Sequence, residues 1–591
     1  ESATAATDSI AFNNYLQVIN ILGNEKNYNA ILANSYLKCG ILKMGVSDQP
    51  AALHFFQQAV AVKQYNNHLP DSLLFQPYLY SGSIQYDLNN LDSAVYYYKK
   101  AEAIIQQYNL LTESERLYNK FGALYYETGD YKKSIGYFEK ALSLVMAKRP
   151  VNVFFVVNYK NNIATALLKM GAYKQALQLF NEILPYHIAE DQLLYNSGNA
   201  YAEEKEYSKA LQYLRQIKQL DLEKYNSMAK IFIQAEQYDS AGLYLSRATI
   251  AFSDKKNQTK KIDYGVTLKY KGDLETATGK IAAAIAHYQL AITNLDPVFA
   301  DTSIYKNPSS FTGLRNFSYL FDALAAKAAA FNKLYETNKD VSVAVHALNA
   351  YTSALALAKH IERTYFSDDA RLFLKNKVNP AIRNAVETAI ALYNESKDSH
   401  YIDIAFAFAE NNKASVLQTG LKDLELLSIP GLPEGLVAAE KKYKSLLARL
   451  TVQLNYSTDS VVALLQKKIQ ENEMALAAVQ EKLDENPYYH QLKFSNNDIS
   501  ITNLQQTLQP EEIILSYYYT SNKLICFSVA KDSLAIVTST LDSAFFKEII
   551  LLRSGLENPQ ASSASMLRES GAILFKKLIS PMQEHLKGKK R

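Results

Sequence analysis

The segment from Leu117 to Ala141, LYNKFGALYYETGDYKKSIGYFEKA, has the pattern of two short amphipathic helices joined by a tight turn. Apolar residues recur every three to four positions on both sides of Gly129-Asp130, a dipeptide that interrupts the helical pattern. Each helix has one apolar stripe, and a single hairpin cannot bury both stripes. Such a hairpin is stable only when copies of it stack on one another. The segment therefore predicts a repeat protein.

Copies of this pattern are present along the first half of the chain. The first helix of each copy has a small marker residue: Gly40, Gly82, Gly122, Ala164, Gly198, Ala229 and Gly272. A small residue of the second helix follows 12 positions later: Ala52, Ala94, Ser134, Ala176, Ala210, Ala241 and Ala284. A large apolar residue comes four positions after that: Phe56, Tyr98, Phe138, Phe180, Leu214, Leu245 and Tyr288. A further copy ends in Ala347, Tyr351 and Ala354. Because the copies keep one register, the sequence predicts a mainly α fold, an α-solenoid of stacked helix hairpins.

The repeat resembles the tetratricopeptide repeat (TPR). Gly122, Tyr125, Gly129, Phe138 and Ala141 stand at the places that the motif expects, and Ser134 replaces the usual alanine. The resemblance implies a right-handed superhelix whose first helices line a concave groove. It also implies that the array binds a protein or an extended peptide in that groove.

The chain has 591 residues, which is too long for one hydrophobic core and indicates several regions. We expect a TPR-type array with a helical N-terminal cap in residues 1–365, and its closing helices in 366–432. After the helix-breaking segment IPGLPEG, the Ala-, Leu-, Lys- and Glu-rich arms Leu436–Leu454 and Ser460–Asn486 predict an antiparallel helical hairpin in residues 433–489.

Residues 490–591 are expected to form a small, incomplete α/β domain. Short β-rich segments are separated by polar turns, and two helical segments follow. The expected strands are Ile513–Tyr518, Leu524–Val529 and Leu534–Thr538, and the expected helices are Ser543–Ser554 and Ala564–Leu578.

The segment YIDIAFAFAENNKASVLQTGL, from Tyr401 to Leu421, is similar to a segment of TPR proteins that carry a CHAT domain, a caspase-like peptidase domain related to separase. The residues that match are Phe406, Ala409, Glu410, Lys413, Ala414 and Leu417. The order of elements after residue 490 also resembles the start of a CHAT domain. The resemblance implies a sensor array that controls a cysteine peptidase with a His-Cys dyad, whose catalytic residues would follow the segment HLKGKKR. We therefore expect this chain to stop before the catalytic half. Glu410 and Lys413 are interpreted as an interface or packing feature.

No catalytic residue, metal site or cofactor site is predicted in this chain. The nine histidines show no metal-type spacing with each other or with Cys39 and Cys526, and no Gly-rich phosphate loop is present. Cys39 and His54 share a repeat, but a nucleophile also needs a third group that orients its base. Cys526 lies in the apolar strand LICFSV, and we predict that it is a small core residue.

A set of polar residues lies close to the marker positions of successive first helices, where the side chains should face the groove: Asn119, Lys120, Asn162, Asn196, Asn199 and Asn226. An Asn side chain offers both a donor and an acceptor, so a ladder of such side chains can hold an extended peptide backbone. These residues are the predicted peptide-binding site. The alternative is that some of them brace adjacent helices.

Charge and hydropathy bound the class of partner. The net charge is 63 minus 59, or +4, which does not indicate nucleic acid as a partner. No apolar run approaches the roughly 20 residues needed to cross a bilayer. The small polar lead ESATAATDS favours a removed signal peptide, hence an exported or periplasmic bacterial protein; the alternative is a cytoplasmic one. The predicted function is a protein- or peptide-binding scaffold, regulatory to a CHAT-type peptidase. A purely structural scaffold is the alternative.

Overall fold

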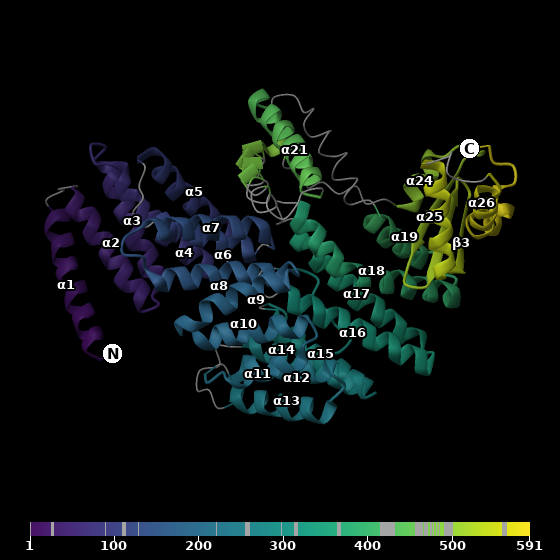
Figure 1. Cartoon of the computed structure of the whole chain (residues 1–591), viewed down its shortest axis with the longest axis horizontal. Coiled ribbons are helices and arrows are strands. Elements are labelled where there is room, and N and C mark those ends of the chain that lie inside the picture. The colour runs from purple at the N-terminus through teal and green to yellow at the C-terminus, as the bar shows by residue number, and fades with distance from the viewer. Residues whose placement is uncertain are drawn as a thin grey trace.

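The computed structural model consists of an array of α-helical hairpins that ends against a small β-sheet (Figure 1). The structure describes residues 2–24, 29–88, 90–108, 114–127, 129–219, 221–253, 261–296, 298–311, 317–362, 368–413, 432–455, ten positions between 465 and 483, 485–489, 500–557 and 564–590.

The array begins with α1 (Ser2–Asn24), in the region expected as a cap, and continues as hairpins of a first and a second helix. The hairpins are α2 (Ala30–Gly45) with α3 (Gln49–Tyr65), α4 (Phe75–Asp87) with α5 (Leu91–Tyr108), α6 (Ser114–Glu127) with α7 (Tyr131–Ala147), α8 (Val153–Lys169) with α9 (Tyr173–Ile183), α10 (Glu190–Glu203) with α11 (Tyr207–Arg215), α12 (Asp221–Gln234) with α13 (Tyr238–Ser253), α14 (Lys261–Ala277) with α15 (Ile281–Leu295), α16 (Phe317–Asn338) with α17 (Val341–Glu362), and α18 (Asp368–Ser396) with α19 (His400–Lys413). This order confirms the predicted α-solenoid.

The turns before α3, α7, α9, α11, α13, α15 and α17 each have a residue with left-handed backbone two positions before the second helix. Glycine supplies it at Gly129, Gly171 and Gly279, with φ between 75° and 80°. Lys205 and Glu236 adopt the same conformation, with φ of 62° and 58°. Left-handed backbone is unfavourable for residues with a Cβ atom, so the packing of the two helices must impose it there.

The register read from the sequence is the register of the structure. The small residues 12 positions after each marker are all fully buried. At Gly122 an added Cβ atom would stand 2.5 Å from the ring of Phe138, and at Gly40 it would stand 2.4 Å from the ring of Phe56. Ser134, the departure from alanine, donates its hydroxyl to the carbonyl oxygen of Gly122 at 2.7 Å. The small residues therefore provide the close contact between the two helices of a hairpin.

The first helices line the inner side of the array. Consecutive first helices from α2 to α18 touch one another, whereas consecutive second helices make no comparable contact within the described elements. The side with the closer spacing is the concave one, so inward-facing residues of α2, α4 and the other first helices share one surface.

An irregular segment between α15 and α16 is held by a buried lysine. Lys327 of α16 is inaccessible to solvent and donates to Gln289 Oε1 at 2.5 Å, Lys306 O at 2.9 Å and Asn307 Oδ1 at 2.9 Å. Burial lowers the pKa of Lys327 to about 7, and the nearby Asp301 opposes this shift. Three oxygen acceptors match the three donors of an ammonium group, so the segment folds around this side chain.

The first arm of the expected hairpin is α21 (Glu434–Asn455), which stands apart from the sheet in Figure 1. Leu483, from the expected second arm, is buried against Leu436 and Val437 at the start of α21. Much of the second arm, Ser460–Asn486, lies outside the described residues.

The C-terminal sheet has three antiparallel strands in sequence order, β1 (Ile513–Tyr519), β2 (Lys523–Ala530) and β3 (Ser533–Thr540), which confirms the three expected strands. One face packs against α18, α19 and α24 (Ile501–Thr507) in a single core that includes Phe406 and Phe527. The other face packs against α25 (Ser543–Glu557) and α26 (Ala564–Leu578). The chain then runs through η3 (Ser580–Met582) and α27 (Gln583–Leu586). The sheet is therefore covered on both faces, and it shares a core with the end of the array.

Candidate functional site

Two of the predicted groove residues pair with each other across neighbouring repeats. Asn162 of α8 donates from Nδ2 to Oδ1 of Asn119 in α6 at 3.0 Å, and both side chains are partly exposed. Each amide keeps donor and acceptor capacity after this bond is made, because a carboxamide can form up to four hydrogen bonds. The pair could still contact a ligand.

Two other residues of the set are buried braces between repeats. Asn196 is 6% exposed, and it donates to Asn161 Oδ1 at 3.0 Å and accepts from Gln192 at 3.1 Å. Asn226 is 5% exposed, and it donates to the carbonyl oxygen of Asp263 at 3.1 Å and accepts from Thr267 at 2.9 Å. Their amides are engaged between helices, as in the bracing alternative.

Asn199 and Lys120, the remaining members of the set, are partly exposed on α10 and α6. Asn199 hydrogen-bonds to the side chain of Tyr195 one turn earlier. Peptide binding by this set of residues stays a prediction.

The structure adds a cluster of tyrosines that the sequence reading did not select. Tyr195 of α10 and Tyr319 of α16 lie close enough to each other, to Tyr126 of α6 and to Tyr270 of α14 for the phenolates of these pairs to repel. Burial is the largest cause that raises the pKa of each tyrosine, and neighbouring carboxylates add to it. Tyr195 and Tyr270 stand three and two positions before their markers, in the same window as the asparagines. We call these four residues the tyrosine cluster.

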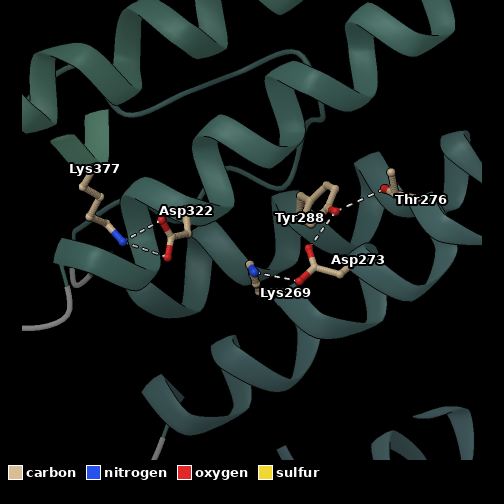
Figure 2. Close-up of polar contacts among 6 residues, drawn as sticks. All are labelled: Lys269, Asp273, Thr276, Tyr288, Asp322 and Lys377. Carbon is tan, nitrogen blue, oxygen red and sulfur yellow. Dashed lines mark hydrogen bonds and ion pairs between the residues drawn. The ribbon is translucent and has the colours of Figure 1, made fainter. Parts of the chain in front are cut away.

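Lysines from three further first helices, α8, α12 and α18, lie near one another. Lys230 of α12 pairs with Glu203 at 2.6 Å, and Lys377 of α18 pairs with Asp322 of α16 at 2.9 Å, as Figure 2 shows for the second pair. Lys169, at the end of α8, has no ion pair within the described part of the chain. Burial lowers the pKa of Lys169, and the charges of Lys377 and Lys230 lower it further. The side chain of Lys169 is nevertheless exposed to solvent, although other parts of the array lie around it.

A second polar group on the inner side is fully paired (Figure 2). Asp273 of α14 accepts from Lys269 at 2.6 Å and from the hydroxyl of Tyr288 at 2.9 Å. That hydroxyl also lies 3.1 Å from Thr276 Oγ1. This network joins α14 to α15 and leaves Lys169 as the more available charge.

The described residues contain no arrangement typical of nucleophilic or metal chemistry. Cys39 is fully buried and Cys526 nearly so, and burial raises the pKa of each thiol to about 11. Among the described residues, no group of three or more His, Cys, Asp or Glu side chains could hold a metal ion.

Glu410 and Lys413 connect the array to the sheet. Lys413 Nζ lies 2.7 Å from Glu410 Oε1, and both side chains form hydrogen bonds with Ser516 Oγ in β1. Next to them, Asn412 donates to the hydroxyl of Tyr518 at 2.9 Å. The interpretation of this pair as an interface feature is confirmed. The residues after Lys413 in the matching segment, including Ala414 and Leu417, lie outside the described part of the chain.

One helix among the described residues, α17, is long and apolar enough to cross a membrane by length and composition. In the structure, its residues Ala347, Tyr351 and Ala354 are buried in the core of the array. Core helices of soluble proteins pass the same test.

Comparison with known proteins identifies the repeats. A family model of the tetratricopeptide repeat matches residues 113–186, and another model of this repeat matches residues 191–224. No curated protein matches the chain.

Several solved structures are similar to the array. One is a tetratricopeptide repeat protein from Parabacteroides merdae ATCC 43184, with 15% identity over 52% of this chain and 100% of that chain, at a TM-score of 0.35. A Rap protein complexed with competence and sporulation factor has 15% identity over 61% and 99%, at a TM-score of 0.41. The human IFIT1 dimer with m7Gppp-AAAA has 13% identity over 67% and 90%, at a TM-score of 0.32.

These structures are too dissimilar for their ligands to be assigned to this chain. The expectation that this chain binds no nucleic acid stays a prediction. The matched repeats and the observed hairpins agree on the fold: the chain contains tetratricopeptide repeats, and its array is a TPR α-solenoid that serves protein interaction.

Proposed function

We propose that the inner side of the array binds an extended segment of a partner protein. The observation that carries the proposal is the tyrosine cluster, four partly accessible aromatic side chains contributed by four different first helices. Tyrosine gives a large contact area with few rotatable bonds and a hydroxyl that can bond to a peptide backbone, which makes it frequent at binding hot spots.

Polar residues of the first helices supply the hydrogen-bonding groups and the charge that a peptide site also needs. Asn119, Asn162 and Asn199 are partly exposed and keep hydrogen-bonding capacity towards a peptide group. Lys169 adds one cation without an ion pair among the described residues. Asn196 and Asn226 contribute indirectly in this proposal, because they hold neighbouring first helices in register.

The test is selection of binders from a displayed library of random 12-residue peptides, followed by fluorescence anisotropy with the selected peptides. Tyr195→Ala and Tyr270→Ala should each weaken binding at least about fivefold, or about 1 kcal/mol, as expected of aromatic contact residues. Tyr96→Ala is the matched control, since Tyr96 is 53% exposed on the second helix α5. Selected peptides that bind equally well to all three variants would place the site elsewhere.

We further propose that the array regulates a cysteine peptidase domain of the CHAT type. This rests on the resemblance of the segment from Tyr401 onward. It is supported by the contacts of Glu410 and Lys413 with Ser516, and by the core that α18 and α19 share with the sheet. A shape change in the array would reach the sheet through these contacts.

The regulatory proposal is tested in the reading frame and then in the protein that it encodes. A strand followed by a His and a later Cys after the codon for Arg591 would support it, and peptidase activity should then respond to an inner-face peptide. A reading frame without such residues would instead favour the purely structural scaffold.

A further inference from the structure

Two aromatic residues from distant parts of the array touch each other. Tyr131, the first residue of α7, is 9% exposed, and its ring meets the ring of Phe373 in α18 edge to face, with centroids 5.2 Å apart. Tyr126, a member of the tyrosine cluster, also packs edge to face against Tyr131, with ring centroids 5.5 Å apart. The early hairpin α6–α7 therefore contacts α18, which begins the sixth hairpin after it.

Charges across the inner side show the same proximity. Lys169 of α8 is close enough to Lys377 of α18 for the two ammonium groups to repel each other. Tyr126 of α6 interacts electrostatically with Tyr319 of α16. Side chains of α6, α8, α16 and α18 therefore lie near one another on the inner side, where Lys169 and Glu203 are exposed to water.

We propose that the Tyr131–Phe373 contact is a clasp that closes the array into a ring, so that the inner side admits an extended polypeptide but excludes a folded domain. The inference deepens the proposed function, on which it rests, by naming the conformation that the partner must have. The ring encloses the tyrosine cluster, and a chain without tertiary structure can lie along it.

The clasp is also weak enough to open. Helices α7 and α18 share no extended helix–helix contact within the described residues, and each packs mainly on its own neighbours. One edge-to-face aromatic pair is a small interaction compared with the packing inside each hairpin. Opening of the clasp would let an internal segment of a partner enter without threading from a free end.

Thiol labelling tests the clasp without any knowledge of the natural partner. A cysteine is placed inside the ring by Lys169→Cys and outside it by Lys174→Cys, since Lys174 is exposed on the second helix α9. The native Cys39 and Cys526 are buried. Each variant is treated with N-ethylmaleimide, with a maleimide on an unstructured 12-residue Gly-Ser peptide, and with a maleimide on folded ubiquitin.

At the outer cysteine, the three reagents should differ in rate by less than about threefold, because the thiol is open to all of them. At the inner cysteine, the ubiquitin reagent should be at least about tenfold slower than the peptide reagent, since it reacts only with a minor open state. Phe373→Ala removes one ring of the clasp and Tyr131→Ala removes the other, so each variant should remove this difference in rate. Circular dichroism melting identifies a variant that fails to fold.

The clasp proposal would be wrong if the ubiquitin reagent labelled the inner and the outer cysteine at the same rate. It would also be wrong if the peptide reagent labelled the inner cysteine as slowly as the ubiquitin reagent does. A block that persists in both folded clasp variants would also overturn it. These rates do not depend on whether selected peptides bind the tyrosine cluster, so failure of the ring and failure of the proposed function can be told apart.

Discussion

Gly122 lies directly against the ring of Phe138, with no room for a methyl group between them. A Cβ atom at residue 122 would stand 2.5 Å from Cδ1 of the ring, closer than real Cβ contacts. The same relation joins Gly82 to Tyr98 and Gly272 to Tyr288. One pair of residues, 16 positions apart, thus sets the spacing of the two helices in hairpin after hairpin.

Gly122→Ala should lower the melting temperature, because overpacking of a filled core typically costs about 1–3 kcal/mol. The matched control is Gly242→Ala in α13, where the new methyl group would meet only Leu274 Cδ2 at 3.8 Å. That change should raise stability by about 0.5–1 kcal/mol, as alanine does in a helix interior. Shifts of the same sign in thermal unfolding would contradict this account of the hairpin contact.

Asn226→Ala should destabilise the array by about 1–2 kcal/mol, because two hydrogen bonds in a buried setting are lost. The partners left behind are the carbonyl oxygen of Asp263 and the fully buried Thr267. Asn376→Ala on the exposed side of α18 is the control, and it should stay within about 0.5 kcal/mol of the parent. Urea denaturation measures both changes; equal midpoints would show that the brace is not needed.

Cys526 should react slowly with a cysteine-directed probe in the folded protein. Burial raises the pKa of its thiol to about 11, and the thiolate is the reactive form, so only about one thiol in a thousand is ionised at pH 8. Mass spectrometry should find Cys526 labelled readily only after unfolding, and peptide libraries should stay uncut. Rapid labelling that is lost in His490→Ala or His585→Ala would revive the idea of a complete enzyme.

The contribution of Lys327 to stability should increase with pH. Its folded pKa is lowered to about 7 from 10.5, so the unfolded chain binds more protons between these values. Stability should therefore increase by up to about 1.4 kcal/mol per pH unit in that window. Lys327→Met removes the titration, and the difference in melting temperature between parent and variant should shift in favour of the parent from pH 7 to pH 9.5. A difference that does not change with pH would contradict the lowered pKa.

The repeat register and the three strands could be predicted because both follow from local periodicity. Gly122, Ser134 and Phe138 belong to one hairpin, and their spacing alone determines which of them meet. The left-handed turns at Lys205 and Glu236 could not be read in this way, since nothing local favours that backbone in lysine or glutamate.

The inner side was harder to predict because its contacts join residues on different repeats. Asn196 reaches Asn161 of the preceding first helix, and Tyr126 comes near Tyr319 only after the superhelix has turned through several hairpins. The positions near the markers were correctly expected to lie on the first helices. Which side chains face a ligand and which face a neighbouring helix depends on the accumulated rotation between repeats. No short stretch of sequence reveals this rotation.

The core that α18 and α19 share with the sheet gives the array a direction of unfolding. In a solenoid each hairpin is held mainly by its neighbours, so fraying starts at a terminal unit. At the C-terminal end, loss of α19 would expose Phe527 and the buried face of β2, whereas α1 packs on the first hairpin at one side, mainly on α2 and also on Phe55 of α3. Native-state hydrogen exchange should therefore be fastest in α1 and slow progressively towards α18. A protease acting on the folded chain would shorten it from the amino end, while the sheet and the closing hairpin remain together.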